Sequence, residues 1–175
     1  MMHKNVGLLT SEPVDPFWHR IYERNAVAEA SLFPMVTPAD GDTIRPYFNA
    51  GCLVVRPERG LLQRWRDEFT LLYQDSILRE MCAQDVKKRI FLHQTALTGA
   101  ILNHLERGEI MEFSDRINYP IFFEQMFGAK KKFNNINDVI TFRHESYFRD
   151  PDPDWENQLQ GPPDKIAWMR EHLFK

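Results

Sequence analysis

The sequence predicts an α/β fold in which helices flank a mostly parallel or mixed β-sheet. Residues 47–55 are a nearly continuous apolar run, which is typical of a strand covered on both faces. The segment that follows carries apolar residues at steps of three and four, the spacing of a helix packed on such a strand. Strand-like and helix-like segments alternate along the rest of the chain, as they do in layered α/β domains.

The first expected elements are a short strand over residues 5–10 and a helix that begins at Pro16. Asp15 is a favourable N-cap, and proline is well suited to the first helical position. The apolar residues at helical spacing are Phe17, Trp18, Ile21 and Tyr22. We expect a second short strand over residues 32–37 and a polar turn over residues 38–42.

Residues 47–55 form the central strand of this prediction, and Pro57 ends it. A helix is expected from Glu58, packed on the strand. Its apolar stripe consists of Leu61, Leu62, Trp65, Phe69 and Leu72. The continuous run and the stripe together predict the core of the domain.

Shorter elements are expected in the second half of the chain. A helix is predicted over residues 94–105, and short strands are predicted over residues 110–113 and 139–143. Residues 150–163 should form a loop, because Asp and Pro alternate at its start. A C-terminal amphipathic helix is expected over residues 164–174.

Length, composition and charge restrict the possible classes of function. The 175 residues fit a single domain, 1–175, and 43% hydrophobic with 27% charged residues is a globular composition. A formal net charge of −3 argues against nucleic acid as a partner. We expect no transmembrane segment and no signal peptide. Cys52 and Cys82 are too few for a disulfide framework or a zinc site, so a cytoplasmic location is expected.

Four segments carry a resemblance to a known family. They are residues 45–65 (RPYFNAGCLVVRPERGLLQRW), 91–102 (FLHQTALTGAIL), 114–120 (SDRINYP) and 140–145 (ITFRHE). In this order they resemble the C-terminal, acceptor-side half of the GT-A fold nucleotide-diphospho-sugar glycosyltransferases, of the glycogenin-like and bacterial galactosyltransferase type. The resemblance extends from residue 45 to residue 145, a little over half of the chain.

The resemblance implies a GT-A-like mixed sheet that lacks the N-terminal nucleotide-binding half. It implies that the intact parent transfers a hexose from a nucleotide diphosphate sugar to a carbohydrate or lipid acceptor. Mn²⁺ or Mg²⁺ would stabilise the leaving diphosphate. Without the first half, we expect the isolated chain to be inactive and to form a homo-oligomer that covers its sheet. The alternative is a non-catalytic relative that binds a carbohydrate or a partner chain.

Two candidate substrate-binding residues, Asn49 and Gly51, lie in the FNAG segment that resembles the family. An Asn amide both donates and accepts hydrogen bonds, which suits a sugar hydroxyl. Gly51 has no side chain, so a ligand can approach its backbone closely. The structural alternative is that Asn49 caps a backbone bend and that Gly51 permits tight packing.

The candidate catalytic residues are His93 and Gln94, which match a segment that the family writes Asp-Gln-Asp. Gln94 would orient the sugar, whereas His93 stands where the family has Asp. We expect both residues at the start of a helix, where free N–H groups favour an anionic ligand. The alternative is that both are ordinary first-turn residues.

His144 resembles the family's metal-ligating histidine, and a neutral imidazole is a good ligand for a divalent ion. Asn118 and Asp40 are further candidate substrate contacts. Two Asp-x-Asp patterns, in residues 40–42 and 150–154, are expected to be surface loops.

Overall fold

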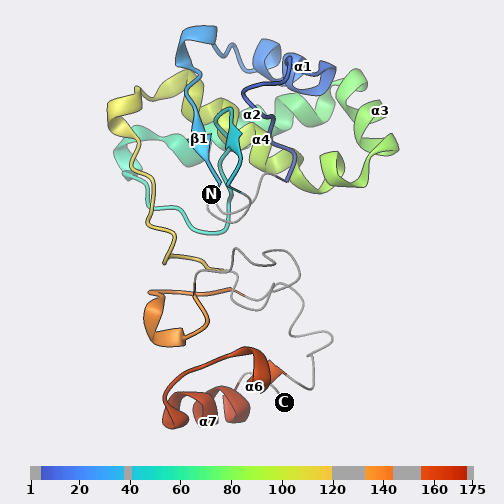
Figure 1. Cartoon of the computed structure of the whole chain (residues 1–175). Coiled ribbons are helices and arrows are strands. Elements are labelled where there is room, and N and C mark those ends of the chain that lie inside the picture. The colour runs from blue at the N-terminus through green and yellow to red at the C-terminus, as the bar shows by residue number, and fades with distance from the viewer. Residues whose placement is uncertain (1–4, 38–40, 120–132, 144–154, 173–175) are drawn as a thin grey trace. The chain divides into compact units, whose positions relative to one another are not determined.

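The computed structural model describes residues 5–37, 41–119, 133–143 and 155–172. The chain divides into two compact units, the first ending at Glu112 and the second beginning at Phe113. The first unit consists of helices and a small two-stranded sheet (Figure 1).

Helix α1, Pro16–Arg24, confirms the first predicted helix. The carboxylate of Asp15 accepts a hydrogen bond from the backbone N–H of Trp18 at 2.8 Å, so Asp15 is the N-cap. The buried residues of α1 are Phe17, Trp18 and Ile21. Local capping and spacing therefore predicted this helix correctly.

The sheet consists of β1, Met35–Val36, and β2, Thr43–Ile44, paired antiparallel. A 3-10 helix, η1 (Glu29–Ser31), precedes it. The predicted strand over residues 5–10 is reduced to one antiparallel bridge, between Leu9 and Ile44. Of the predicted turn over residues 38–42, residues 38–40 lie outside the described residues.

Residues 47–55 form no strand, so the predicted central strand is wrong. Tyr47 is fully buried, but Val54 is 81% exposed. The backbone N–H of Phe48 donates to the Thr98 hydroxyl on a helix at 3.0 Å, and no neighbouring strand accepts it. An apolar run indicates burial, but it does not distinguish a strand from an irregular segment packed on helices.

Three helices follow in the first unit: α2 (Leu61–Gln74), α3 (Ser76–Gln84) and α4 (Val86–His104). A 3-10 turn, η2 (Pro57–Arg59), precedes α2. Gly60 links the two with φ of 64°, a left-handed conformation that glycine adopts without steric cost. The helix predicted from Glu58 is therefore split at this glycine.

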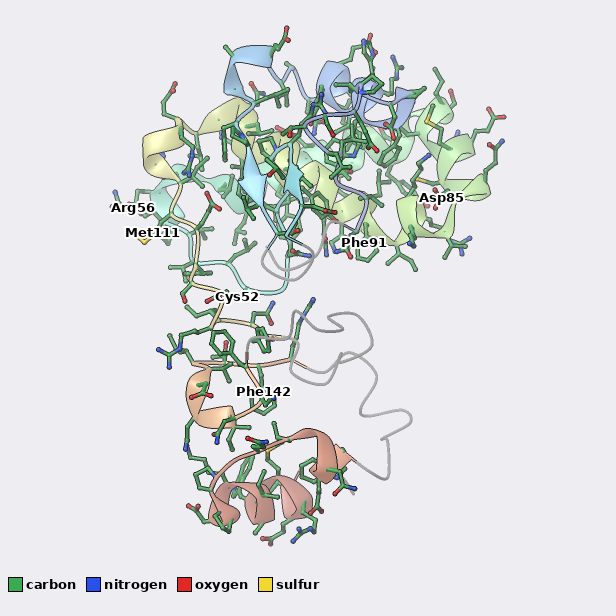
Figure 2. The ribbon with its side chains drawn as sticks, viewed as in Figure 1. Cys52, Arg56, Asp85, Phe91, Met111 and Phe142 are labelled. Carbon is green, nitrogen blue, oxygen red and sulfur yellow. The ribbon has the colours of Figure 1, made fainter. Side chains whose placement is uncertain are left out.

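Two aspartates separate the later helices. Asp75 caps α3 and Asp85 caps α4, and each carboxylate accepts from the backbone N–H groups two and three residues further on. Figure 2 shows Asp85 at the junction of α3 and α4. The prediction missed α3 and placed the start of α4 at Gln94, well after its true start at Val86.

Helix α4 is the buried centre of the first unit, because α1, α2 and α3 all contact it (Figure 1). Apolar clusters lie along it, and Phe48 and Trp65 pack against both of them. Of the predicted α2 stripe, Leu61 and Leu72 are buried, whereas Leu62 is half-exposed. The stripe of α2 faces α4 rather than a strand.

The end of the first unit holds the 3-10 helix η3, Arg107–Glu109. Residues 110–113 form no strand, contrary to the prediction. The described sheet is small and antiparallel, so the first unit is helix-rich and compatible with a mixed α/β class. No helix in the described ranges is long and apolar enough to cross a membrane.

The second unit contains η5 (Ile136–Asp138), α6 (Trp155–Gln158) and α7 (Pro163–His172). Helix α7 corresponds to the predicted C-terminal helix, and α6 lies within the loop predicted over residues 150–163. The predicted strand over residues 139–143 is reduced to one parallel bridge, between Tyr119 and Phe142.

Candidate functional site

The candidate site forms where residues 47–49, which we call the strap, cross helix α4. The side-chain Oε1 of Gln94 accepts a hydrogen bond from the Tyr47 hydroxyl at 2.5 Å and another from Asn49 Nδ2 at 3.2 Å. Gln94 is only 8% exposed. Two residues that resemble family site positions, Asn49 and Gln94, are therefore in direct contact. We call Tyr47, Asn49 and Gln94 the amide cluster.

The strap is held on two successive turns of α4. Thr98 lies one helical turn after Gln94, and its hydroxyl accepts from the backbone N–H of Phe48 at 3.0 Å. The same hydroxyl donates to the backbone carbonyl of Gln94 at 2.9 Å. Thr98 is fully buried. Its hydroxyl accepts the hydrogen bond from Phe48 N–H that a carbonyl of a neighbouring strand would accept in a sheet.

Tyr47 is fixed from the opposite side by α1. Its ring meets Trp18 edge to face, with centroids 5.9 Å apart. The Trp18 indole N–H donates to the backbone carbonyl of Val6 at 2.6 Å, which holds that ring in place. Burial raises the pKa of the Tyr47 phenol well above its usual range, so the hydroxyl stays protonated at physiological pH.

The amide cluster keeps one donor and one acceptor open. Among the described residues, neither Gln94 Nε2 nor Asn49 Oδ1 makes a further hydrogen bond. Exchanging oxygen and nitrogen in both amides leaves the same inventory, one NH₂ group and one carbonyl. These side chains can bind and orient a neutral hydroxyl, because an amide does not exchange a proton near neutral pH.

His93 is in the interior of α4, which corrects the prediction that it starts a helix. Its Nδ1 pairs with the backbone carbonyl of Ile90 at 2.9 Å, and its own carbonyl accepts from the Trp65 indole N–H at 2.7 Å. Mid-helix N–H groups are already bonded within the helix, so the argument for an anion at His93 and Gln94 no longer applies.

Of the other predicted site residues, one lies in the first unit, one belongs to the second unit, and two are outside the described residues. Gly51 is exposed in a turn two residues after Asn49. Asn118 belongs to the second unit, where its backbone N–H donates to the Thr141 hydroxyl at 2.8 Å. Asp40 and His144 lie outside the described residues.

A divalent metal needs several carboxylate, imidazole or thiolate ligands around one point. The ranges that the structure describes contain no group of three such side chains. The described residues therefore do not by themselves form a site for Mn²⁺ or Mg²⁺.

A second polar group, which the sequence prediction missed, joins α2 to α4. The His104 ring lies with Nε2 at 3.0 Å from Glu68 Oε1 and with Nδ1 at 3.1 Å from an Arg64 guanidinium nitrogen. The sequence feature that could have indicated this group is the spacing of Arg64 and Glu68, which lie one helical turn apart on α2. Tyr47 and Thr98 were also missed, although Tyr47 directly precedes the FNAG segment and Thr98 follows Gln94 by one turn.

Residues 6–104 match the family model of the Rhodobacterales glycosyltransferase domain. The match covers more than half of the 175 residues and includes the strap and all of α4. Comparison with curated proteins and with solved structures found no match. The extent of the family match is decisive: the chain belongs to the Rhodobacterales glycosyltransferase domain family.

Proposed function

We propose that the protein serves in the transfer of a hexose from a nucleotide diphosphate sugar to an acceptor, with the amide cluster as a sugar contact. One observation carries the proposal. Asn49 and Gln94, which resemble sugar-contacting positions, share a hydrogen bond, and each retains an open polar group. The glycosyltransferase family match over residues 6–104 supports the same class of reaction.

The chemistry of the cluster fits a sugar better than an ionic ligand. A sugar hydroxyl donates one hydrogen bond and accepts others, so one NH₂ group beside one carbonyl can satisfy it on both sides. Each such neutral hydrogen bond contributes about 0.5–1.5 kcal/mol. In this role Gln94 orients the sugar and takes no proton, since an amide has no useful pKa.

The proposal also takes its finer details from the resemblance. These are a GT-A-like architecture corresponding to the acceptor-side half, a carbohydrate or lipid acceptor, and Mn²⁺ or Mg²⁺ at the leaving diphosphate. The metal part depends on His144, which lies outside the described residues. Turnover with each donor should therefore be measured both with and without added Mn²⁺ or Mg²⁺.

The test uses the full chain and its Gln94→Ala and Asn49→Ala variants. Binding of UDP-glucose, UDP-galactose and the free hexoses is followed by saturation-transfer NMR, and turnover is measured with the same donors. We expect each variant to weaken sugar binding by roughly threefold to tenfold, the effect of one lost neutral hydrogen bond. Gln63→Ala is the matched control, because Gln63 is exposed on α2.

The outcomes separate the two candidate functions. Sugar binding that needs Asn49 and Gln94, together with turnover, supports the transferase. The same binding without turnover favours a carbohydrate-binding module. If the unaltered chain binds none of these sugars or nucleotide sugars while circular dichroism shows it folded, the proposal is wrong.

A further inference from the structure

We infer that Tyr47 is a positioning residue, whose hydroxyl fixes the direction of the Gln94 side-chain amide and so decides which of its polar groups is offered to a ligand. This inference rests on the proposed function, because the direction matters only if a sugar binds there. It assigns a role to a buried tyrosine outside the set of residues that the family resemblance suggested.

The first step concerns the single proton of the phenol. Tyr47 is fully buried, and its hydroxyl donates to Gln94 Oε1 at 2.5 Å. Among the described residues the Tyr47 hydroxyl donates to no other acceptor, so a Gln94 amide turned the other way would leave the phenol proton without an acceptor. A donor at this point requires an acceptor on Gln94, so the carbonyl faces Tyr47 and the NH₂ group faces away.

The second step is that Asn49 cannot set this direction. Asn49 and Gln94 are both amides, and each has one end that donates and one that accepts. Asn49 Nδ2 can pair with Gln94 Oε1, as observed at 3.2 Å, or both amides can turn over and pair equally well. Tyr47 removes this degeneracy, because only one of the two arrangements places an acceptor against its proton.

The third step is that the Tyr47 hydroxyl has a fixed position. The ring is fully buried and packs edge to face on Trp18, whose indole is tied to the Val6 carbonyl. The backbone beside it is tied to α4 through Phe48 and Thr98. A hydroxyl held from both sides acts as a stationary reference for the amide.

Tyr22 provides a matched control within the same core. Its ring centroid lies 5.3 Å from that of Trp18, and its buried hydroxyl has no hydrogen-bond partner among the described residues. Tyr22→Phe and Tyr47→Phe therefore remove the same atom from neighbouring positions. Only Tyr47→Phe removes a hydrogen bond to Gln94.

The experiment follows the Gln94 side-chain NH₂ signals in ¹⁵N-labelled full-length chain, assigned by their loss in Gln94→Ala. We expect Tyr47→Phe to shift these signals or to split them into two sets, and Tyr22→Phe to leave them in place. With UDP-galactose as the probe, Tyr47→Phe should weaken binding roughly threefold to tenfold, and Tyr22→Phe should not.

Unchanged Gln94 signals in Tyr47→Phe overturn the positioning role, whatever happens to sugar binding. If Tyr47→Phe does not fold, the unaltered chain decides: nuclear Overhauser effects that place the Gln94 NH₂ group against the Tyr47 ring overturn the role, and effects that place it away from Tyr47 support it. If Tyr47→Phe shifts the Gln94 NH₂ signals but the unaltered chain binds no sugar, the proposed function is refuted and the positioning of the Gln94 amide by Tyr47 still holds. The NMR readout thus separates failure of the inference from failure of the function.

Discussion

Glu68 shows how burial alters the chemistry of a single residue. An Arg guanidinium can only donate, so the His104 Nδ1 next to Arg64 is an acceptor and Nε2 carries the hydrogen toward Glu68. Burial raises the pKa of Glu68 to about 7, even though Arg64 opposes the shift. Burial and Arg64 together lower the pKa of His104. The group that titrates near neutral pH is therefore the carboxyl, and the imidazole stays neutral.

This shift predicts how stability depends on pH. Between pH 4.5, the ordinary Glu pKa, and pH 7, the unfolded chain loses the Glu68 proton while the folded chain keeps it. The unfolded state then binds fewer protons, so the free energy of unfolding falls as pH rises through this window. We expect Glu68→Gln to become progressively more stable than the unaltered chain between pH 4.5 and pH 7, with a constant difference above it.

Urea midpoints measured at several pH values test this prediction. His104, with its lowered pKa, contributes a slope of opposite sign below about pH 6.5, and both proteins share it. The quantity to compare is therefore the difference between the two proteins. A difference that does not change with pH would show that Glu68 has an ordinary pKa. The control is Asp67→Asn, which removes an exposed carboxylate from the neighbouring position on α2.

At the scale of elements, caps divide the region between α2 and α4 into separate helices. Asp75 does more than cap α3, because its carboxylate also pairs with Arg20 at 2.7 Å and Arg24 at 3.3 Å on α1. Its side chain is 3% exposed. Asp85 makes the same kind of cap for α4, but its side chain is 42% exposed. The two caps therefore differ mainly in burial and in their ion pairs.

We expect Asp75→Ala to lower the free energy of unfolding by about 2–3 kcal/mol, since it removes a cap and charge-assisted hydrogen bonds to arginines that stay partly exposed. Asp85→Ala, the matched control, should cost only about 1 kcal/mol, the usual value of an N-cap. Chemical denaturation of both variants measures the contrast. Equal losses in the two variants would mean that the arginines on α1 add nothing to the cap.

At the scale of the whole molecule, the first unit is organised around α4. Gly99 on this helix lies directly against Asn25, the residue that ends α1. A Cβ atom at Gly99 would lie 1.8 Å from Asn25 Nδ2, which is far inside van der Waals contact. Asn25 is 3% exposed, so its side chain has little room to move. The close contact between α1 and α4 thus depends on a residue without a side chain at position 99.

Gly99→Ala should therefore destabilise the first unit by at least about 1–3 kcal/mol, the usual cost of overpacking. Gly108→Ala is the control, because a Cβ there meets nothing within 4 Å and should change stability by less than about 1 kcal/mol. Thermal unfolding of both variants, followed by circular dichroism, measures the effect. An unaltered Gly99→Ala melting curve would show that α1 shifts freely on α4.

The irregular conformation of residues 47–55 removes the basis for the predicted homo-oligomer. The predicted homo-oligomer rested on a central strand over residues 47–55 with uncovered apolar faces. No such strand exists in the described part of the chain, and Tyr47 is instead covered by Trp18. That reason for an oligomer no longer applies.

Features that depend on near neighbours could be predicted from the sequence. Asp15 and the apolar spacing after it predicted α1, because a cap and a helical stripe involve residues only three or four positions apart. The same kind of periodicity predicted α7. The family resemblance pointed to a glycosyltransferase, which the family match confirmed, and to Asn49 and Gln94 as candidate sugar contacts.

Features that depend on partners distant in the sequence could not be predicted and became visible in the folded chain. Residues 47–49 form the strap and not a strand, because the backbone N–H of Phe48 donates to the Thr98 hydroxyl on α4 and not to a carbonyl of a neighbouring strand. Tyr47 entered the candidate site through a bond to Gln94, 47 residues away. Capping and periodicity depend on residues that are close in the sequence. A buried polar group must form a hydrogen bond, but its partner can lie anywhere in the chain and is brought within reach only by folding.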